Sequence, residues 1–318
     1  MFAVYRRALL LLFLLVSAAC AANPRGEIHG VAVSPDGKTI AVAYMKGKTG
    51  FIYRIATETG IAARLTDAKT GKESSPAFSP DGKRIAFSYL TGQTNQRIVV
   101  MNTDGSNPHS LPGSGTANLY PTFSPDGNTI YFARPQPPPA DHLWDIFSVR
   151  VDGSDLRQVT HGGFVQISQP SISSDGGKLQ VATLGLWTPQ RIEIYHLDEP
   201  DSPSQVLSPI VPHQATPGPI FAYPNFMPDG KSILFLAASN RIVSYDYDVY
   251  RLDLDSGTIE RLTKGIGYPT DLRVFADGKT AVLLKWRSDW QGTAVKSRFY
   301  LLDLQTHKLT LFKVSGLN

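Results

Sequence analysis

The chain has 318 residues, a formal net charge of +4 and one cysteine. The low charge argues against a nucleic-acid groove, because such sites carry a clustered basic patch. A single thiol cannot form the intramolecular disulfides that hold many small secreted domains together. We therefore expect the fold to depend on buried apolar side chains.

The first predicted element is a leader over residues 1–21. It has a basic start at Arg6-Arg7, an apolar core from 8 to 16 and small residues before Cys20, which is the pattern of a secretory signal. The tetrapeptide SAAC that ends at Cys20 resembles a bacterial lipobox, although Ser17 stands where an aliphatic residue is usual. The resemblance implies lipidation of Cys20 and a tethered protein in the bacterial periplasm. Ordinary signal cleavage, which would leave a soluble periplasmic or secreted protein, is the alternative.

A nine-residue motif then recurs six times, at intervals of 45 to 54 residues. Its copies are SPDGKTIAV (34–42), SPDGKRIAF (79–87), SPDGNTIYF (124–132), SSDGGKLQV (173–181), MPDGKSILF (227–235) and FADGKTAVL (275–283). Asp and Gly occur in every copy, whereas Pro is replaced in two. A tight turn explains this pattern, because Gly accepts positive φ and Pro only presets its own φ. Each aspartate stands alone in its turn, so we expect no metal site there.

A second pattern follows each motif, in which two short apolar runs flank a polar turn, as in FIYRIATETGIAARLT (51–66) and DVYRLDLDSGTIERLT (248–263). Each unit therefore contains four strands. Four short antiparallel strands in a repeat of this length are typical of a β-propeller blade. The sequence predicts an all-β, six-bladed propeller over residues 27–318. The sixth unit has its own fourth strand at 309–314, so we expect no strand exchange where the ring closes.

The SPDGK turn, the strand after it and endings such as Arg64-Leu65-Thr66 resemble the repeats of TolB-type propellers (PD40 repeats). The resemblance extends from about residue 27 to residue 314 and concerns the propeller alone. It implies a cell-envelope protein, and the fold by itself does not specify an activity.

Antiparallel strand order places all six DG turns on one face of the ring, which we call the DG face. The opposite face, called the long-loop face, receives the long insertions 134–145, 184–190, 208–225, 238–248 and 285–298. Loops on a rigid scaffold carry function, and Trp, Tyr and Arg dominate binding energy. The predicted binding residues in these insertions are Arg134, His142, Trp144, Trp187, Tyr245, Trp286, Arg287 and Trp290. Some of these aromatic residues, Trp187 and Trp286 among them, could instead cap the ends of blades.

We expect a periplasmic scaffold that holds a protein or peptide on the long-loop face, with no cofactor, no metal and no nucleic acid, and with a membrane contact only through the lipid anchor. The alternatives are a propeller enzyme acting on polysaccharide, as a lyase or hydrolase, and a glycan-binding module. The chain has no G-x-S-x-G, H-E-x-x-H or P-loop motif, and these would have announced common hydrolase, metal or nucleotide sites. An enzyme should bring two ionisable side chains into hydrogen-bond reach at the channel mouth.

Overall fold

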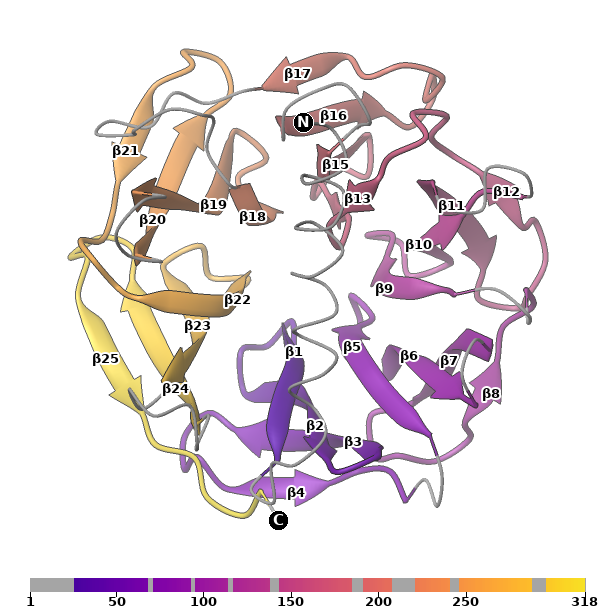
Figure 1. The fold of residues 1–318 in the computed structure, drawn as a ribbon, viewed down its shortest axis with the longest axis horizontal. Helices are drawn as coiled ribbons and strands as arrows, with labels where there is room; N and C mark the ends of the chain where they lie inside the picture. The colour runs from indigo at the N-terminus through magenta and orange to yellow at the C-terminus, as the bar shows by residue number, and fades with distance from the viewer. Residues whose placement is uncertain are drawn as a thin grey trace, which may run out of the picture.

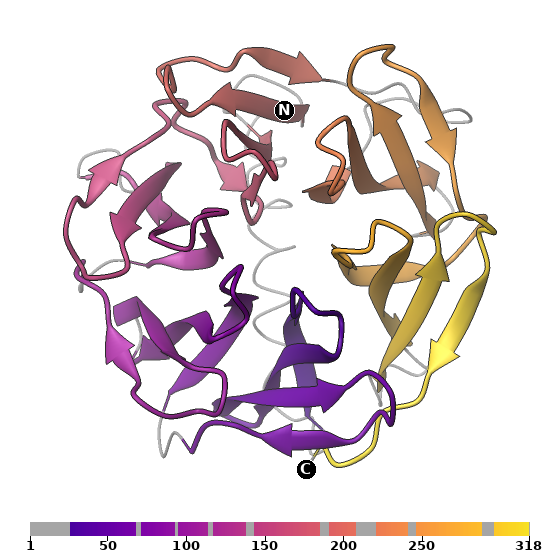
Figure 2. The ribbon, with the colours of Figure 1, turned by 180° about the vertical axis from the view of Figure 1, so that it is seen from behind.

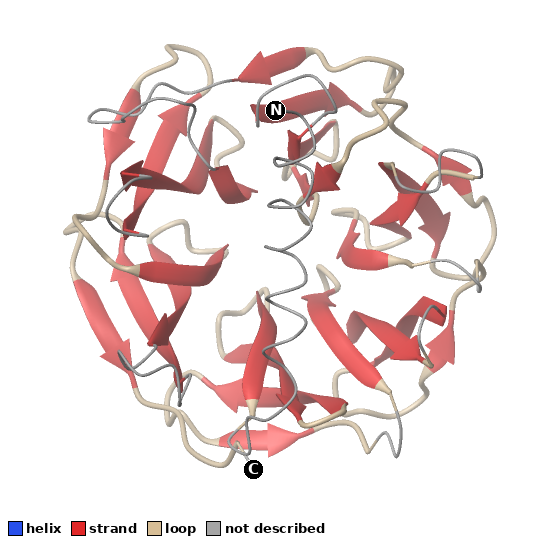
Figure 3. Cartoon of the chain, viewed as in Figure 1, coloured by secondary structure: helices blue, strands red, loops and turns tan. Residues whose placement is uncertain are grey.

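The computed structural model describes residues 26–317 except 68–70, 93–94, 114–116, 138–142, 185–190, 208–220, 241–245 and 288–295. The regular elements of this part of the chain are all strands (Figure 3). It contains no helix long and apolar enough to cross a membrane.

The strands form six antiparallel sheets, one for each repeat unit. Blade 1 contains β1 (Glu27–Val33), β2 (Thr39–Lys46), β3 (Thr49–Ala56) and β4 (Ala62–Arg64). Blade 2 contains β5 (Lys72–Phe78), β6 (Arg84–Thr91), β7 (Asn95–Asn102) and β8 (His109–Ser110). Blade 3 contains β9 (Leu119–Phe123), β10 (Thr129–Pro135), β11 (Trp144–Arg150) and β12 (Arg157–Gln158).

Blade 4 differs because its inner strand is divided into β13 (Gln166–Ile167) and β14 (Ser171–Ile172), which both pair with β15 (Lys178–Leu184). Its outer strands are β16 (Arg191–His196) and β17 (Gln205–Leu207). Blade 5 contains β18 (Phe221–Phe226), β19 (Ser232–Asn240), β20 (Asp246–Asp253) and β21 (Ile259–Arg261). Blade 6 contains β22 (Tyr268–Val274), β23 (Thr280–Arg287), β24 (Lys296–Asp303) and β25 (Leu309–Phe312).

The blades form a ring in which the first strand of each lies nearest the centre and the last lies on the circumference (Figure 1). We call the region around the axis of the ring the central channel, as in other propellers. The same ring is seen from behind in Figure 2. The ring closes without strand exchange, because β1 pairs with β2 of its own blade and β22 to β25 form a separate sheet. The predicted six-bladed propeller with four-stranded blades is therefore confirmed.

The DG turns join neighbouring blades as well as neighbouring strands. Gly82 has φ 69°, as the turn requires, and the Asp81 carboxylate accepts hydrogen bonds from the Ser79 hydroxyl and the Lys83 amide. A Cβ added at Gly82 would lie 3.8 Å from Pro35 of the preceding turn. The same relation links Gly127 to Pro80, and it recurs at Gly176 and Gly278. Proline in the repeat therefore also provides a packing surface for the next blade, a role that turn geometry alone did not predict.

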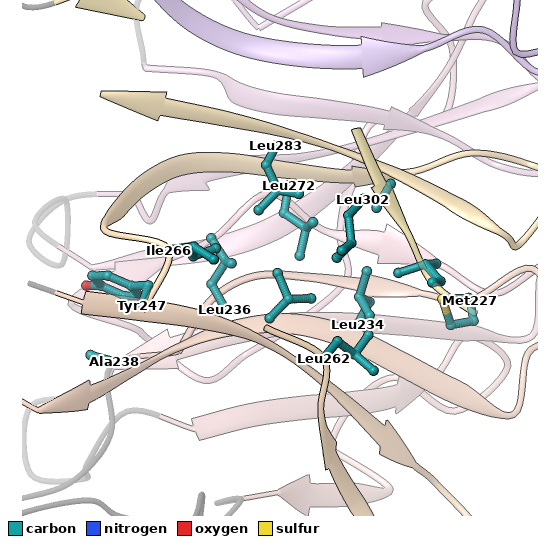
Figure 4. Packing of buried hydrophobic residues seen from close by; sticks show 13 residues of the cluster. Met227, Leu234, Leu236, Ala238, Tyr247, Leu262, Ile266, Leu272, Leu283 and Leu302 are labelled. Atoms are coloured by element: carbon teal, nitrogen blue, oxygen red, sulfur yellow. The ribbon is translucent and has the colours of Figure 1, made fainter. Parts of the chain in front are cut away.

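Apolar side chains between adjacent blades form the core. In Figure 4, Leu234 and Leu236 of β19 face Leu272, Leu283 and Leu302 of blade 6. All five are completely buried. Because each blade presents both faces of its sheet to neighbours, the strands carry continuous apolar runs rather than alternating ones.

The Arg-Leu-Thr endings tie the outer strand to the third strand of the blade. The Thr263 hydroxyl accepts the amide N–H of Val249 and donates to the buried carboxylate of Asp248. Arg261 completes the arrangement with a bond of 2.5 Å to the same carboxylate. Blade 3 repeats this arrangement with Thr160 and Asp145. The acidic residues at this end of the blades are thereby drawn into the protein.

The chain beyond β25 crosses to blade 1. The predicted last strand, 309–314, ends earlier, at Phe312, because the following residues pair with a different blade. Ser315 donates to the Gly60 carbonyl and accepts from the Ala62 amide, at 3.0 and 2.8 Å. Val314 and Leu317 pack on the core between blades 6 and 1. This tail therefore reinforces the closure at the circumference.

Candidate functional site

The connections at the two ends of the blades differ as the strand order requires. The DG turns are short and alike, whereas the connections after β10, β15, β17, β19 and β23 are long, and the strands that they join have their ends at the opposite end of the blades. Of the predicted binding residues, the side chains of Arg134 and Trp144 are described. His142, Trp187, Tyr245, Trp290 and the lipidation candidate Cys20 lie outside the described residues. Trp286 and Arg287 are described as backbone only, paired with Ser297 and Lys296 at the end of β23.

Arg134 has a structural role. Its Nε donates to Asn118 Oδ1 at 2.8 Å and its Nη2 donates to the Gly113 carbonyl at 3.1 Å. The guanidinium also lies 5.2 Å from the centre of the Phe147 ring. These contacts hold the connection before β9 against blade 3, and burial lowers the pKa of Arg134.

Trp144 likewise packs within the fold. Its backbone exchanges two hydrogen bonds with Phe164, of 2.7 and 2.9 Å, and its side chain contacts the core between blades 3 and 4. Trp144 therefore caps a blade end, the role considered above for Trp187 and Trp286.

The structure reveals a cluster in the central channel that sequence reasoning missed. Each inner strand other than the divided one carries a bulge. At four of these bulges a residue has positive φ: Gly30 and Ser75, and the bulky residues Tyr120 and Tyr223, with φ of 58° and 50°. Positive φ is strained for a bulky residue, and such strain persists where the surrounding structure enforces it, often at functional sites. We therefore regard these two tyrosines as the centre of the candidate site.

The two tyrosines share an electrostatic environment with blade 6. Burial raises the pKa of both Tyr120 and Tyr223, and the nearby carboxylate of Asp271 raises both further. Arg273 acts in the opposite direction on each. Side chains from blades 3, 5 and 6 are therefore near enough to one another to interact electrostatically.

Asp271 and Arg273 close the ring at the channel wall. Asp271 is 2% exposed; one of its carboxylate oxygens accepts the Val31 amide N–H and the other accepts the Leu272 amide, each at 2.9 Å. Arg273 Nη1 lies 3.1 Å from Asp271, and its Nε donates to the Val31 carbonyl at 2.9 Å. Burial raises the pKa of Asp271, whereas Arg273 and the two amides lower it. Blade 6 thus binds both backbone groups of Val31 in blade 1.

Arg273 also reaches across the channel to the side-chain carbonyl of Gln169 in blade 4. On the DG side of this contact lies a cavity of about 150 Å³. Its polar lining comes from Thr122, Gln169, Ser171, Asn225 and Arg273, and the rest is apolar. The inner strands run toward the DG face. Each bulge residue comes two residues before the polar lining residue of its strand, so it lies about 6.6 Å closer to the long-loop face than the cavity does.

The cluster can bind a ligand more readily than it can transfer protons. The Asp271–Arg273 pair brings two ionisable groups into hydrogen-bond reach in the channel, which is the geometry expected of an enzyme. Both carboxylate oxygens, however, already accept backbone hydrogen bonds, one from Val31 across the ring closure and one from the neighbouring Leu272. The two tyrosines are half-buried, with Tyr120 packed against the core between blades 3 and 4 and Tyr223 against the core between blades 5 and 6. Their exposed parts suit a peptide or a sugar, because a tyrosine combines an aromatic ring with a hydroxyl. Within the described ranges no three His, Cys, Asp or Glu side chains are placed to hold a metal ion.

A signal for the cluster exists in the repeat. The equivalent position, six residues before the DG aspartate, holds Gly30, Ser75, Tyr120, Gln169, Tyr223 and Asp271 in turn. It lies at the bulge in blades 1, 2, 3 and 5 and directly after it in blade 6. In four units proline follows it. If the six units are aligned on their DG turns, the residue type at this position differs between units while the DG motif after it is repeated.

Comparisons with known proteins agree with this architecture. Residues 22–214, more than half of the chain, match the family model of the TolB beta propeller domain (PD40). A search of curated proteins gave no match.

Among solved structures, the putative TolB of Agrobacterium tumefaciens is 20% identical with a TM-score of 0.59, over 75% of this chain and 81% of that one. TolB of Acinetobacter baumannii is 15% identical with a TM-score of 0.61, over 93% of this chain and 65% of that one, so this chain spans slightly less than two thirds of its length. An oligogalacturonate lyase of Vibrio parahaemolyticus is 15% identical with a TM-score of 0.57, over 91% of this chain and 79% of that one. At these identities the likeness concerns the fold alone.

Proposed function

Because the chain belongs to the TolB beta propeller family, we propose that it is a cell-envelope scaffold that holds a protein or peptide partner at the long-loop face. The observation that carries the proposal is the pair of strained tyrosines, Tyr120 and Tyr223, on the long-loop side of the channel. An extended segment entering the channel mouth would meet their rings and hydroxyls. The predicted residues Arg287 and Trp290 would contact the remainder of the partner.

The proposed location is the bacterial periplasm, with a lipid anchor on Cys20. Cys20→Ser should then move the protein from the membrane pellet to the soluble periplasmic fraction. If the natural protein is already soluble, ordinary signal cleavage replaces the lipoprotein proposal and the binding proposal is unaffected.

Affinity capture from envelope extracts tests the binding role. We expect a partner to be retained by the natural chain and lost by Tyr120→Ala with Tyr223→Ala, or by Arg287→Ala with Trp290→Ala. A true hot spot costs about 2 kcal/mol or more, which weakens binding roughly thirtyfold. Lys38→Ala with Lys83→Ala on the DG face is the matched control and should leave binding unchanged. A larger loss in the control would assign the function to the opposite face.

The second candidate is an enzyme that acts on polysaccharide, and the Asp271–Arg273 pair in the channel favours it. Its test is the cleavage of an acidic polysaccharide such as polygalacturonate, measured as the release of new chain ends. Activity that disappears in Asp271→Asn, with the melting curve retained, would support the enzyme. Absence of cleavage by the natural chain would reject this substrate.

A further inference from the structure

The two faces of the ring differ in charge, although the formal net charge of the chain is small. On the long-loop face, cations lie at the strand ends and in the connections of five blades. They are Lys46, Lys48, Lys72, Arg97, Arg134, Lys264, Lys285 and Arg298, which we call the basic rim. Lys46, Lys48 and Lys264 are exposed and the others are half-buried. Among the half-buried ones, Arg134 is hydrogen-bonded as described above, and Arg97 and Lys285 lie over tyrosine rings. None of the basic rim forms an ion pair within the described part of the chain.

The acidic residues at the same end do not offset the basic rim at the surface. Most are buried among hydrogen-bond partners, namely Glu27, Glu73, Asp145, Glu193, Asp248 and Asp271. Asp67 is exposed, and Arg64 pairs with it at 2.6 Å. Burial also raises the pKa of Glu73 to about 7, so this carboxyl is only partly charged near neutral pH. The described side chains of the long-loop face therefore present positive charge to solvent.

The DG face has the opposite character. Every DG turn exposes its aspartate, and the second turns of the blades add exposed acids such as Glu58, Asp104, Asp152, Asp255 and Asp303. Hydrogen bonds from serine and from backbone amides lower the pKa of turn aspartates such as Asp36 and Asp81. These carboxylates are therefore ionised at neutral pH. Lysines on this face, including Lys38 and Lys83, lie among them.

The two faces are far enough apart to act separately. β2 has eight residues, so its ends lie about 25 Å apart. The Debye length is about 8 Å at physiological salt. The charges of one face are therefore largely screened from a charged surface beside the other face. The chain also enters the ring at the long-loop face, because β1 runs from Glu27 toward the DG turn that follows it.

We propose that the long-loop face binds membranes that contain anionic phospholipids, through the basic rim. The rim is spread over five of the six blades rather than concentrated in a groove, which suits a planar array of headgroups more than a single acidic peptide. The acidic DG face then points away from the bilayer. This property goes beyond the proposed scaffold function and does not require it, and it would present the channel mouth to partners at the membrane surface.

Vesicle sedimentation tests the proposal without a lipid anchor. The ring closes within residues 26–317, so the chain from Ala21 onward is suitable, and it lacks both the leader and any acyl group. The probes are phosphatidylcholine vesicles with and without about 30% phosphatidylglycerol, a composition that approximates an anionic leaflet. We expect binding only with phosphatidylglycerol, and we expect about 0.5 M NaCl to abolish it because salt screens the attraction.

The matched variants change the same number of lysines on each face. Each lysine near an anionic surface strengthens binding about fivefold. Lys46→Ala, Lys48→Ala and Lys264→Ala together should therefore weaken vesicle binding about a hundredfold. Lys38→Ala, Lys83→Ala and Lys279→Ala together should leave it unchanged. Three results would overturn the proposal: equal binding to both kinds of vesicle, no binding to either, or an equal loss of binding in the DG-face variant. The outcome of partner capture with the tyrosine variants bears only on the scaffold function.

Discussion

Replacing Asp271 by alanine should weaken the closure of the ring. The substitution removes the acceptor for two amides, those of Val31 and Leu272, and the counter-ion of Arg273. An unsatisfied buried donor costs about 1–3 kcal/mol, and breaking a buried ion pair from one side costs about 3–5 kcal/mol. Because these contributions overlap, we expect the free energy of unfolding to fall by about 3–5 kcal/mol in total.

Urea unfolding followed by intrinsic fluorescence measures this loss, and hydrogen exchange at the Val31 amide localises it to the junction of blades 6 and 1. Asp277→Ala is a matched control, because Asp277 accepts amides only within its own exposed turn; it should cost about 1 kcal/mol. In a double-mutant cycle with Arg273→Met, the coupling should be about 1–3 kcal/mol. If Asp271→Ala costs no more than Asp277→Ala, the pair does not secure the closure, and a role in ligand chemistry becomes the better explanation of its burial.

Three further predictions concern other parts of the ring. Burial raises the pKa of Glu73 to about 7 in the folded state from 4.5, so the folded chain retains a proton that the unfolded chain releases, and stability falls as the pH rises from about 4.5 to about 7. Glu73→Gln should remove this slope, worth about 3 kcal/mol, and parallel pH profiles of the free energy of unfolding for the two proteins would contradict the assignment. At Tyr120, glycine should be more stable than alanine by about 1 kcal/mol, the reverse of the usual strand preference, because only glycine tolerates positive φ without strain; thermal melts that rank alanine first would exclude strain. Gly60→Ala should destabilise the chain by about 2 kcal/mol more than Gly257→Ala. The new Cβ at residue 60 would collide with the Lys313 carbonyl of the tail, whereas a Cβ at Gly257, in the equivalent turn of blade 5, would have nothing within 4 Å. Equal melting temperatures of the two variants would show that the tail adds no stability.

The fold could be predicted because its signals are local and repeated. A DG turn requires glycine at positive φ, so each copy marks the start of the second strand whatever surrounds it. The four-strand unit followed from the hairpin that trails each turn. The interblade contact between Gly82 and Pro35 could not be predicted in the same way, because it joins residues from different copies of the repeat and depends on how the blades pack.

The candidate site was harder to predict because it is assembled from different blades. Trp144 and Arg134 attract attention as loop residues, yet the fold uses both to secure blade ends. Tyr120 and Tyr223 lie within strands and carry no local motif. Their significance comes from a backbone bulge and from Asp271, which is far away in the sequence.

The charge polarity has a similar origin. A net charge sums over both faces, and the sum is small because the DG face and the long-loop face carry opposite excesses. In the repeat, the turn aspartates are fixed at one end of every blade by the geometry of the DG turn. The threonines that follow the fourth strands, such as Thr160 and Thr263, bind the carboxylates of Asp145 and Asp248 inside the protein at the other end. The two sequence features that build the blade therefore also separate its charges, so a ring made of such units is electrostatically polar along its axis even when its formal charge is close to zero. An anionic surface would bind this ring with the long-loop face toward it and the DG face away from it. The tyrosines would then be reached from the side of the ring that faces that surface.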